Sequence, residues 1–327
     1  MRFGMFIPQG WRQDLTGIEP ARHWSTMRDL AQHADAGAWE SIWVYDHFHS
    51  VPEPNGEAVH EAWSLINAFG AVTDRARLGQ MCTCMAYRNP AYLAKVAATA
   101  DIVSGGRVEM GIGGGWYEHE WRAYGYGFPR VGDRLGALDE GVQIFRQMWG
   151  TGTGTLHGKF YDVEGAQLSP LPLQAGGPPL WIAGGGEKVT LRIAAKYGQY
   201  TNFGGNPEAF AAKSEILAGH CRDLGRDFDE ITRSSSFNVV IAESEKDLPA
   251  LLDRYEAHYA KTVPNSAAAE RADLAGGYLV GTPEQIVEKL EHMASLGLGY
   301  AICYFPLVAY DRSALGLFER EVLPALT

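Results

Sequence analysis

Residues 107–116, Arg-Val-Glu-Met-Gly-Ile-Gly-Gly-Gly-Trp, join a short apolar run to three consecutive glycines. A continuous apolar run of this length is typical of a parallel strand that is covered on both faces, and glycines let a backbone approach another group closely. Residues 179–186 have the same form, with Pro-Leu-Trp-Ile-Ala followed by Gly-Gly-Gly. The two stretches predict an α/β protein with functional loops at the carboxyl ends of its strands.

Apolar runs of strand length recur along the whole chain, separated by segments with helical periodicity. We expect strands at 2–7, 41–45, 77–84, 107–112, 179–183, 198–203, 234–241 and 299–305. Regular alternation without a linker or a break in composition favours one domain over 1–327, folded as a (β/α)8 TIM barrel, although a doubly wound sheet also fits the count.

Two segments depart from the alternation. Residues 151–170 contain glycines around a short apolar run, and we expect a small inserted hairpin there. Residues 261–277 are small, polar and glycine-containing, which predicts a mobile, lid-like insertion near the active-site end of the barrel.

Composition and charge exclude several functional classes. The net charge of −11 argues against non-specific nucleic-acid binding. The four cysteines are too few for a disulfide scaffold and show no paired zinc pattern, so we expect no metal. No apolar run is long enough to span a membrane, and the first residues do not form a signal peptide. We therefore expect a cytoplasmic protein that acts on a small molecule.

Asp46 and His47 directly follow the second expected strand, at the mouth of the predicted barrel. A histidine there can give or take a proton near neutral pH, although a structural hydrogen bond between the two side chains is an equally good interpretation. Gly113, Gly114 and Gly115 follow the fourth strand, where they would let the backbone approach a ligand or form a plain tight turn. The neighbouring Trp116 would then wall a flat ring or pack in the core.

Gly184, Gly185 and Gly186 follow the fifth strand, and the pattern predicts that they open a helix at Glu187. Glycine amides at a helix N-terminus form a phosphate site. The place is unusual for a barrel, where such sites more often follow the last two strands, and Glu187 would oppose an anion unless it points away.

A charged cluster and a single arginine also invite a functional interpretation. Glu118, His119 and Glu120 form an acidic cluster, for which a solvated loop or helix cap is the better interpretation because no second cluster at ligand spacing accompanies it. Arg88 ends the loop after the third strand and is a candidate partner for an anion or a carboxylate.

Several longer motifs occur together in this chain, at Arg88–Pro90, Asp101–Arg107, Gly111–Trp116, Gly132–Leu135, Pro178–Gly186 and Gly281–Ile286. As a set they resemble the luciferase-like monooxygenase superfamily, and within it the branch that depends on coenzyme F420, a deazaflavin. The resemblance covers nearly the whole chain.

The resemblance implies a flavin-like ring at the barrel mouth, with Asp46 and His47 beside it and His47 serving in proton transfer or substrate orientation. Met81-Cys82 matches a segment that carries a non-proline cis peptide in related enzymes. Gly113–Gly115 would lie along the cofactor and Gly184–Gly186 would contact its phosphate.

Trp116 departs from the pattern of one group of relatives. The sugar-phosphate dehydrogenases that use the same deazaflavin carry a catalytic glutamate at this position, which argues against that substrate class here.

The sequence thus predicts an F420-dependent oxidoreductase that transfers a hydride between the deazaflavin C5 and a small apolar or aromatic substrate. An FMN-dependent two-component monooxygenase, supplied with reduced flavin by a separate reductase, is the alternative, and a flavin carrier without chemistry is a third. Because 90–103 is rich in alanine, which permits close helix approach, and relatives pair through the helices after the second and third strands, we expect a homodimer.

Overall fold

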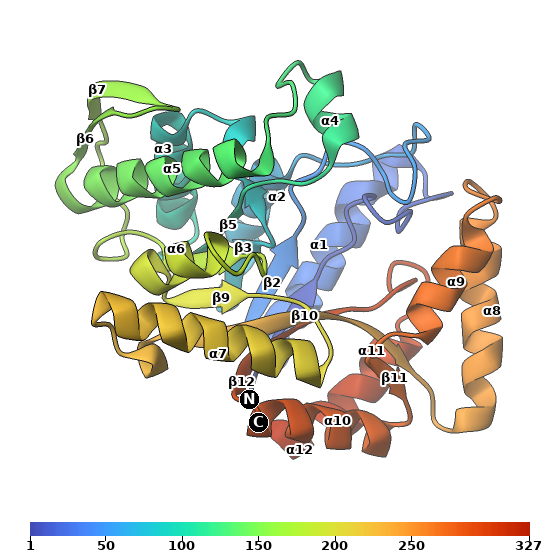
Figure 1. The fold of residues 1–327 in the computed structure, drawn as a ribbon. Coiled ribbons are helices and arrows are strands. Elements are labelled where there is room, and N and C mark those ends of the chain that lie inside the picture. Colours follow the sequence, from blue (N-terminus) through green and yellow to red (C-terminus); the bar gives the residue numbers. More distant parts are fainter.

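The computed structural model describes residues 1–327 and shows a closed barrel of parallel strands surrounded by helices (Figure 1). The barrel strands are β1 (Arg2–Phe6), β2 (Ser41–Val44), β3 (Arg77–Gln80) with its continuation β4 (Thr83–Cys84), β5 (Val108–Gly113), β8 (Leu180–Ala183), β9 (Tyr200–Asn202), β10 (Thr232–Ile241) and β12 (Leu298–Tyr304). Parallel pairings of β9 with β10, β10 with β12 and β12 with β1 close the circle. The predicted (β/α)8 barrel and its eight strands are confirmed.

Helices follow the strands and cover the outside of the barrel. The long ones are α1 (Pro20–Ala36), α2 (Ala62–Gly70), α3 (Pro90–Val103), α5 (Val131–Thr151), α6 (Thr190–Tyr197), α7 (Pro207–Leu224), α8 (Leu248–Tyr259) and α10 (Pro283–Ser295). Local sequence fixes several of their starts: Thr282 and Gln285 form a reciprocal capping box at α10, where Pro283 takes the first position. No helix has both the length and the apolar character that crossing a bilayer requires.

The core has two layers that alternate along each strand. Side chains that point outward pack under the helices in one large cluster. Side chains that point inward fill the barrel with Phe6, Trp43, Met81, Trp181, Tyr300, Ile302 and Tyr304. The barrel interior is therefore a packed core with a floor of aromatic rings, and the active-site end of the barrel lies above that floor.

The expected hairpin is present as the antiparallel pair β6 (Thr153–His157) and β7 (Asp162–Gln167). It lies beside α5 (Figure 1), where the Glu140 carboxylate accepts the amide hydrogens of Lys159, Phe160 and Tyr161.

The prediction of an irregular loop over 261–277 is wrong. Residues Ala267–Ala275 form a helix, α9, because the run of alanines favours helix and because Ala267 and Leu274 bury themselves against α8. The expected position is correct, since Thr262 donates to Gln13 in the loop after β1 at 3.1 Å, at the carboxyl end of the barrel. A short strand, β11 (Leu279–Gly281), follows α9 and adds to β10 outside the barrel.

The chain ends in α11 (Ser313–Leu317), a π-helical turn (Phe318–Val322) and α12 (Leu323–Leu326), and one further short helix, α4 (Glu118–Ala123), follows β5.

Candidate active site

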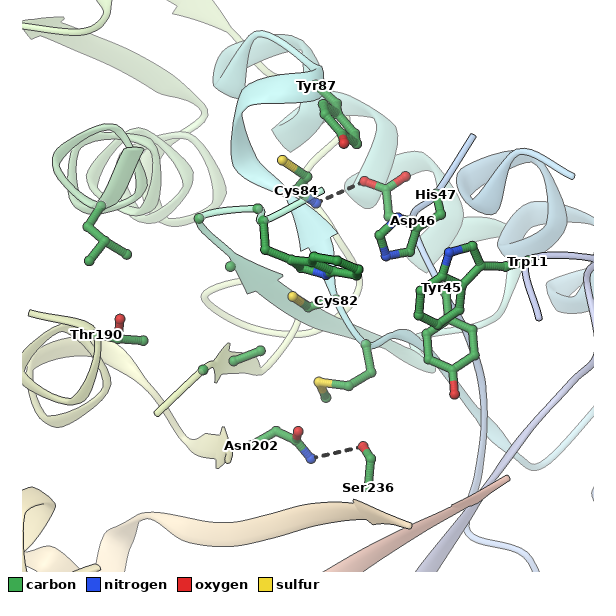
Figure 2. A pocket seen from close by; sticks show the side chains of 18 residues that line it. Trp11, Tyr45, Asp46, His47, Cys82, Cys84, Tyr87, Thr190, Asn202 and Ser236 are labelled. Atoms are coloured by element: carbon green, nitrogen blue, oxygen red, sulfur yellow. Dashed lines mark hydrogen bonds between the residues drawn. The ribbon is translucent and has the colours of Figure 1, made fainter. Parts of the chain in front are cut away.

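A cavity of about 370 Å³ lies at the carboxyl ends of the barrel strands (Figure 2). Nine of the eleven site residues expected from the sequence line it: Asp46, His47, Met81, Cys82, Gly113, Gly114, Gly115, Trp116 and Gly184. Gly185 and Gly186 follow Gly184 outside the lining. Figure 2 shows His47 and Trp11 on one side of the cavity, Thr190 on the opposite side and the Asn202–Ser236 pair at its base.

His47 is held from two directions. Its ring stacks on Trp11 with centroids 4.2 Å apart and an angle of 2° between the planes. Its Nδ1 lies 2.9 Å from Oε2 of Glu120, which α4 contributes. The imidazole therefore has one fixed orientation at the cavity wall.

Glu120 is fully buried, which overturns the expectation of a solvated loop or cap at this residue. Its Oε1 accepts the amide hydrogens of Phe48 and His49, and its Oε2 accepts the Tyr87 hydroxyl at 2.9 Å. Burial acts to raise the pKa of Glu120, but the hydrogen bonds from His47 and from the two amides outweigh burial and hold the pKa below its ordinary value.

The charge of Glu120 decides which nitrogen of His47 carries the proton. An ionised carboxylate can only accept hydrogen bonds, so Nδ1 of His47 must be the donor. Nε2 makes no hydrogen bond within the chain and belongs to a ring that lines the cavity. The arrangement leaves Nε2 as the atom that can take a proton from a ligand or return one to it.

Asp46 and His47 do not bond to each other. Asp46 forms a two-pronged ion pair with Arg88, at 2.8 and 2.9 Å, and accepts the amide hydrogen of Cys84. The expectation that Arg88 meets a carboxylate is confirmed. Because both oxygens of the buried Asp46 are engaged, this carboxylate fixes the segment after β3.

The segment after β3 packs directly against the glycine loop after β5. The Met81–Cys82 peptide is cis, as the resemblance implied. A Cβ at Gly113 would stand 2.7 Å from the Cys82 sulfur, and one at Gly115 would stand 2.5 Å from the Cys84 sulfur. These two glycines therefore admit the neighbouring segment, in addition to any contact with a ligand.

The glycine loop after β8 leaves backbone donors free. The amides of Gly185 and Gly186 donate no hydrogen bond within the chain. Helix α6 begins at Thr190 and not at Glu187, so the loop is three residues longer than expected. Glu187 pairs with Lys213 at 2.6 Å, so its charge is neutralised and does not oppose an anion at this loop. Free amides beside a cavity fit a phosphate-bearing cofactor.

A family model described as luciferase-like monooxygenase matches residues 1–299. The chain belongs to the luciferase-like monooxygenase family. The predicted membership is confirmed, and with it the prediction of a luciferase-like oxidoreductase.

Relatives of this luciferase-like protein include enzymes with either cofactor. An F420-dependent glucose-6-phosphate dehydrogenase of Nocardia farcinica is 28% identical over 326 residues, covering 91% of this chain and 93% of its own. An F420-dependent secondary alcohol dehydrogenase has the same fold, with a TM-score of 0.81 and 19% identity over 100% of this chain and 99% of its own. The oxygenating constituent of 3,6-diketocamphane monooxygenase from Pseudomonas putida, in complex with FMN, has a TM-score of 0.72 and 18% identity over 99% and 98%.

A second polar cluster lies at the mouth of this luciferase-like barrel, and sequence reasoning missed it. Arg12, in the loop after β1, donates to Asn238 at 2.7 Å and lies 4.6 Å from the centre of the Tyr304 ring. Asp14 accepts hydrogen bonds from the Gly10 amide and the Tyr304 hydroxyl. Burial raises the pKa of Asp14 to about 6, although both hydrogen bonds favour its charged form.

No three side chains of His, Cys, Asp or Glu come together as a possible metal-binding group.

Proposed function

We propose that this protein is an oxidoreductase that uses coenzyme F420 to transfer a hydride to or from a small apolar or aromatic organic substrate. One observation carries the proposal: His47, with Nδ1 fixed by the buried Glu120 and Nε2 free, borders a cavity that ends at a loop with unbonded amides. The names of full-length relatives at 26 to 28% identity, all F420-dependent, support this choice of cofactor.

The residues present fit a deazaflavin cofactor. Met81–Cys82 and Gly113–Gly115 would border its ring, Trp116 would cover the edge, and the free amides of Gly185 and Gly186 would hold its phosphate. When bound, the deazaflavin supplies or accepts a hydride at C5. The side chains of the site must orient the substrate and donate or accept the one proton that accompanies the hydride.

His47 is the residue that we assign to the proton. Nε2 would give a proton to the substrate oxygen or nitrogen in one direction and take it back in the other. The Glu120 carboxylate lies 2.9 Å from the other ring nitrogen and keeps the ring in the orientation that this role needs. Asp46 we assign a positioning role, because it holds the Cys84 amide and Arg88.

The cavity walls indicate the substrate class. None of the residues that line the cavity is a lysine or an arginine. A phosphorylated sugar would need such a cation or further free amides, whereas an apolar or aromatic substrate suits the walls that Trp11, Tyr45, Met81 and Leu135 provide. The lining therefore supports a substrate other than the glucose 6-phosphate for which those relatives are named.

Binding of the two rival cofactors tests the proposal. The apo-protein is titrated with coenzyme F420 and, separately, with FMN, and tryptophan fluorescence is followed. We expect F420 to bind at micromolar concentration or below and FMN to bind more weakly. The reverse order, together with oxygen uptake in the presence of reduced FMN, would identify a monooxygenase that needs a separate reductase.

The role of His47 is tested by His47→Ala. The variant should keep F420 affinity and lose at least about 100-fold in turnover, the usual contribution of a general acid or base. His49→Ala is the matched control, because that side chain pairs with His119 at the exposed rim. Equal turnover in the two variants would refute the assignment.

We further propose that two copies of the chain pair through α2 and α3. Tyr92, Ile102 and Val103 expose between 36% and 62% of their surface on α3 and offer an apolar face to a second copy. The alanines of this helix at 94, 97, 98 and 100 are buried in the chain's own core, so the expected close approach through alanine does not apply.

A further inference from the structure

We propose that a groove along α6 binds the anionic tail of the deazaflavin, and that this groove is what distinguishes coenzyme F420 from FMN. The inference rests on the function proposed above. Beyond its ring, ribityl chain and phosphate, F420 carries a lactyl group and a chain of glutamates, each of which adds a carboxylate. FMN ends at its phosphate. A protein that selects F420 therefore gains by placing cations beyond its phosphate site.

The groove begins where the main cavity ends. A cavity of about 180 Å³ lies between α5 and α6, which run side by side (Figure 1). Leu135 lines both this cavity and the main one, and Lys188 enters it directly after the glycine loop. A ligand whose phosphate is held by Gly185 and Gly186 would thus continue into the groove.

Three cations form one row along the groove. Arg192 and Lys196 are four residues apart on α6 and share one face of that helix, and Lys188 lies in the turn just before it. All three are exposed and line the same groove. Lys188 and Arg192 take part in no ion pair and no side-chain hydrogen bond, whereas many other cations of the protein are paired.

Little negative charge opposes this row. Asp139 is the acidic residue in the groove, and it lies 3.5 Å from the Lys196 ammonium and accepts a hydrogen bond from Gln143. Glu187 is neutralised by Lys213. In a chain with a net charge of −11, a row of three cations of which two have no acidic partner is a local reversal of the overall field.

The row leads to a second basic cavity. Lys196 also lines a cavity of about 530 Å³ near the start of β8, to which Arg146 contributes a guanidinium with no carboxylate partner. A long glutamate chain would therefore meet cations along the full length of α6, and a short chain only at Lys188 and Arg192.

The experiment compares cofactor forms that differ only in the tail. Dissociation constants are measured by fluorescence titration at low and high salt for three ligands. The long-tailed form is F420 with several glutamates, the tail-free form ends at the lactyl phosphate and carries no glutamate, and the third ligand is FMN. We expect the long-tailed form to bind more tightly than the tail-free form at low salt, and the difference to shrink at high salt because exposed charges are screened.

A triple variant, Lys188→Gln, Arg192→Gln and Lys196→Gln, should weaken binding of the long-tailed form by about tenfold, since each exposed pair contributes only a small factor. Binding of the tail-free form should not change.

The matched control replaces three exposed, unpaired cations elsewhere, Arg22→Gln, Lys246→Gln and Arg312→Gln, and should change neither constant. Equal weakening in both triple variants would show that overall charge is responsible and would overturn the inference. The inference would also be overturned if the wild-type protein bound F420 equally well whatever the length of the tail, and the proposed function would then remain intact. A protein that binds no deazaflavin at all would overturn both.

Discussion

Replacing Glu120 by glutamine changes one atom and tests the central geometry of the site. The carboxylate has four donors, two amides on Oε1 and the His47 and Tyr87 side chains on Oε2. A glutamine oxygen can keep the two amides, but its NH2 group then faces two donors. His47 can relieve the conflict by moving its proton from Nδ1 to Nε2, which turns the free nitrogen in the cavity from an acceptor into a donor.

The expected loss of stability follows from the hydrogen bonds affected. Two charge-assisted bonds are replaced by neutral or rearranged ones, at a cost of about 1–2 kcal/mol each, so the free energy of unfolding at pH 7 should fall by about 2–4 kcal/mol. The pKa of Glu120 is lowered in the folded state. Its stabilising effect is therefore complete above the ordinary glutamate pKa and disappears as the pH falls through the folded value, so the difference between the two proteins should shrink at acidic pH.

Three measurements on the Glu120→Gln variant separate these effects. Urea unfolding between pH 4 and 8 gives the stability, nitrogen NMR of labelled histidine gives the His47 tautomer, and steady-state kinetics gives turnover. We expect the proton on Nε2, F420 affinity close to wild type, and turnover lower by about 100-fold to 10,000-fold, the range over which general acid–base catalysis contributes.

The control is Glu118→Gln, two residues away on the same helix, whose carboxylate is exposed and pairs only with Arg122. It should change stability by less than about 0.5 kcal/mol and leave the tautomer unchanged. The reasoning is refuted if the Glu120 variant keeps the wild-type tautomer and stability. A changed tautomer with unchanged turnover would instead remove His47 from the chemistry.

Three other substitutions make independent predictions. Asp46→Asn leaves Arg88 beside a neutral amide and should lower the free energy of unfolding by about 3 kcal/mol at pH 7; a loss below about 1 kcal/mol in urea unfolding would contradict the role of this pair. Asp14→Asn should raise the free energy of unfolding by about 3 kcal/mol at pH 8 and hardly at all at pH 4. The folded pKa of Asp14, about 6, lies above the ordinary value, so the wild type loses stability as the pH rises through that range. A gain in urea unfolding that persists at pH 4 would argue against this cause. Tyr92→Glu should convert the proposed dimer to monomer in light scattering, and an unchanged mass would exclude α3 as the interface.

The barrel was predictable because its signals are local. Each strand is a short apolar run that ends in glycine or polar residues, and helix starts such as Pro207 and Pro283 carry their own caps. The helix at 267–275 was not predictable, because its short alanine run lies between polar and glycine-containing turns. Its stability comes from burial against α8, which the local sequence does not indicate.

The chemistry of the site was only partly predictable, because partners come from distant parts of the chain. Asp46 and His47 are neighbours in sequence, yet side chains of consecutive residues in extended backbone point apart, so each finds a different partner. His47 meets Glu120, 73 residues away, and Asp46 meets Arg88, 42 residues away. Nothing in the spacing of Glu118–Glu120 indicates which of the two acids is buried.

The shared carboxylate of Glu120 has a consequence for engineering this barrel. Loops at the mouth of such a fold are often exchanged one at a time to alter substrate range. Here the loop after β2 supplies two amides and an imidazole to Glu120 of α4, the short helix in the connection after β5. Replacing the loop after β2 alone would remove donors from the buried charge of Glu120. Replacing the α4 segment alone would leave the amides of Phe48 and His49 without their acceptor. Residues 46–49 and 117–121 should therefore be transplanted as a single cassette.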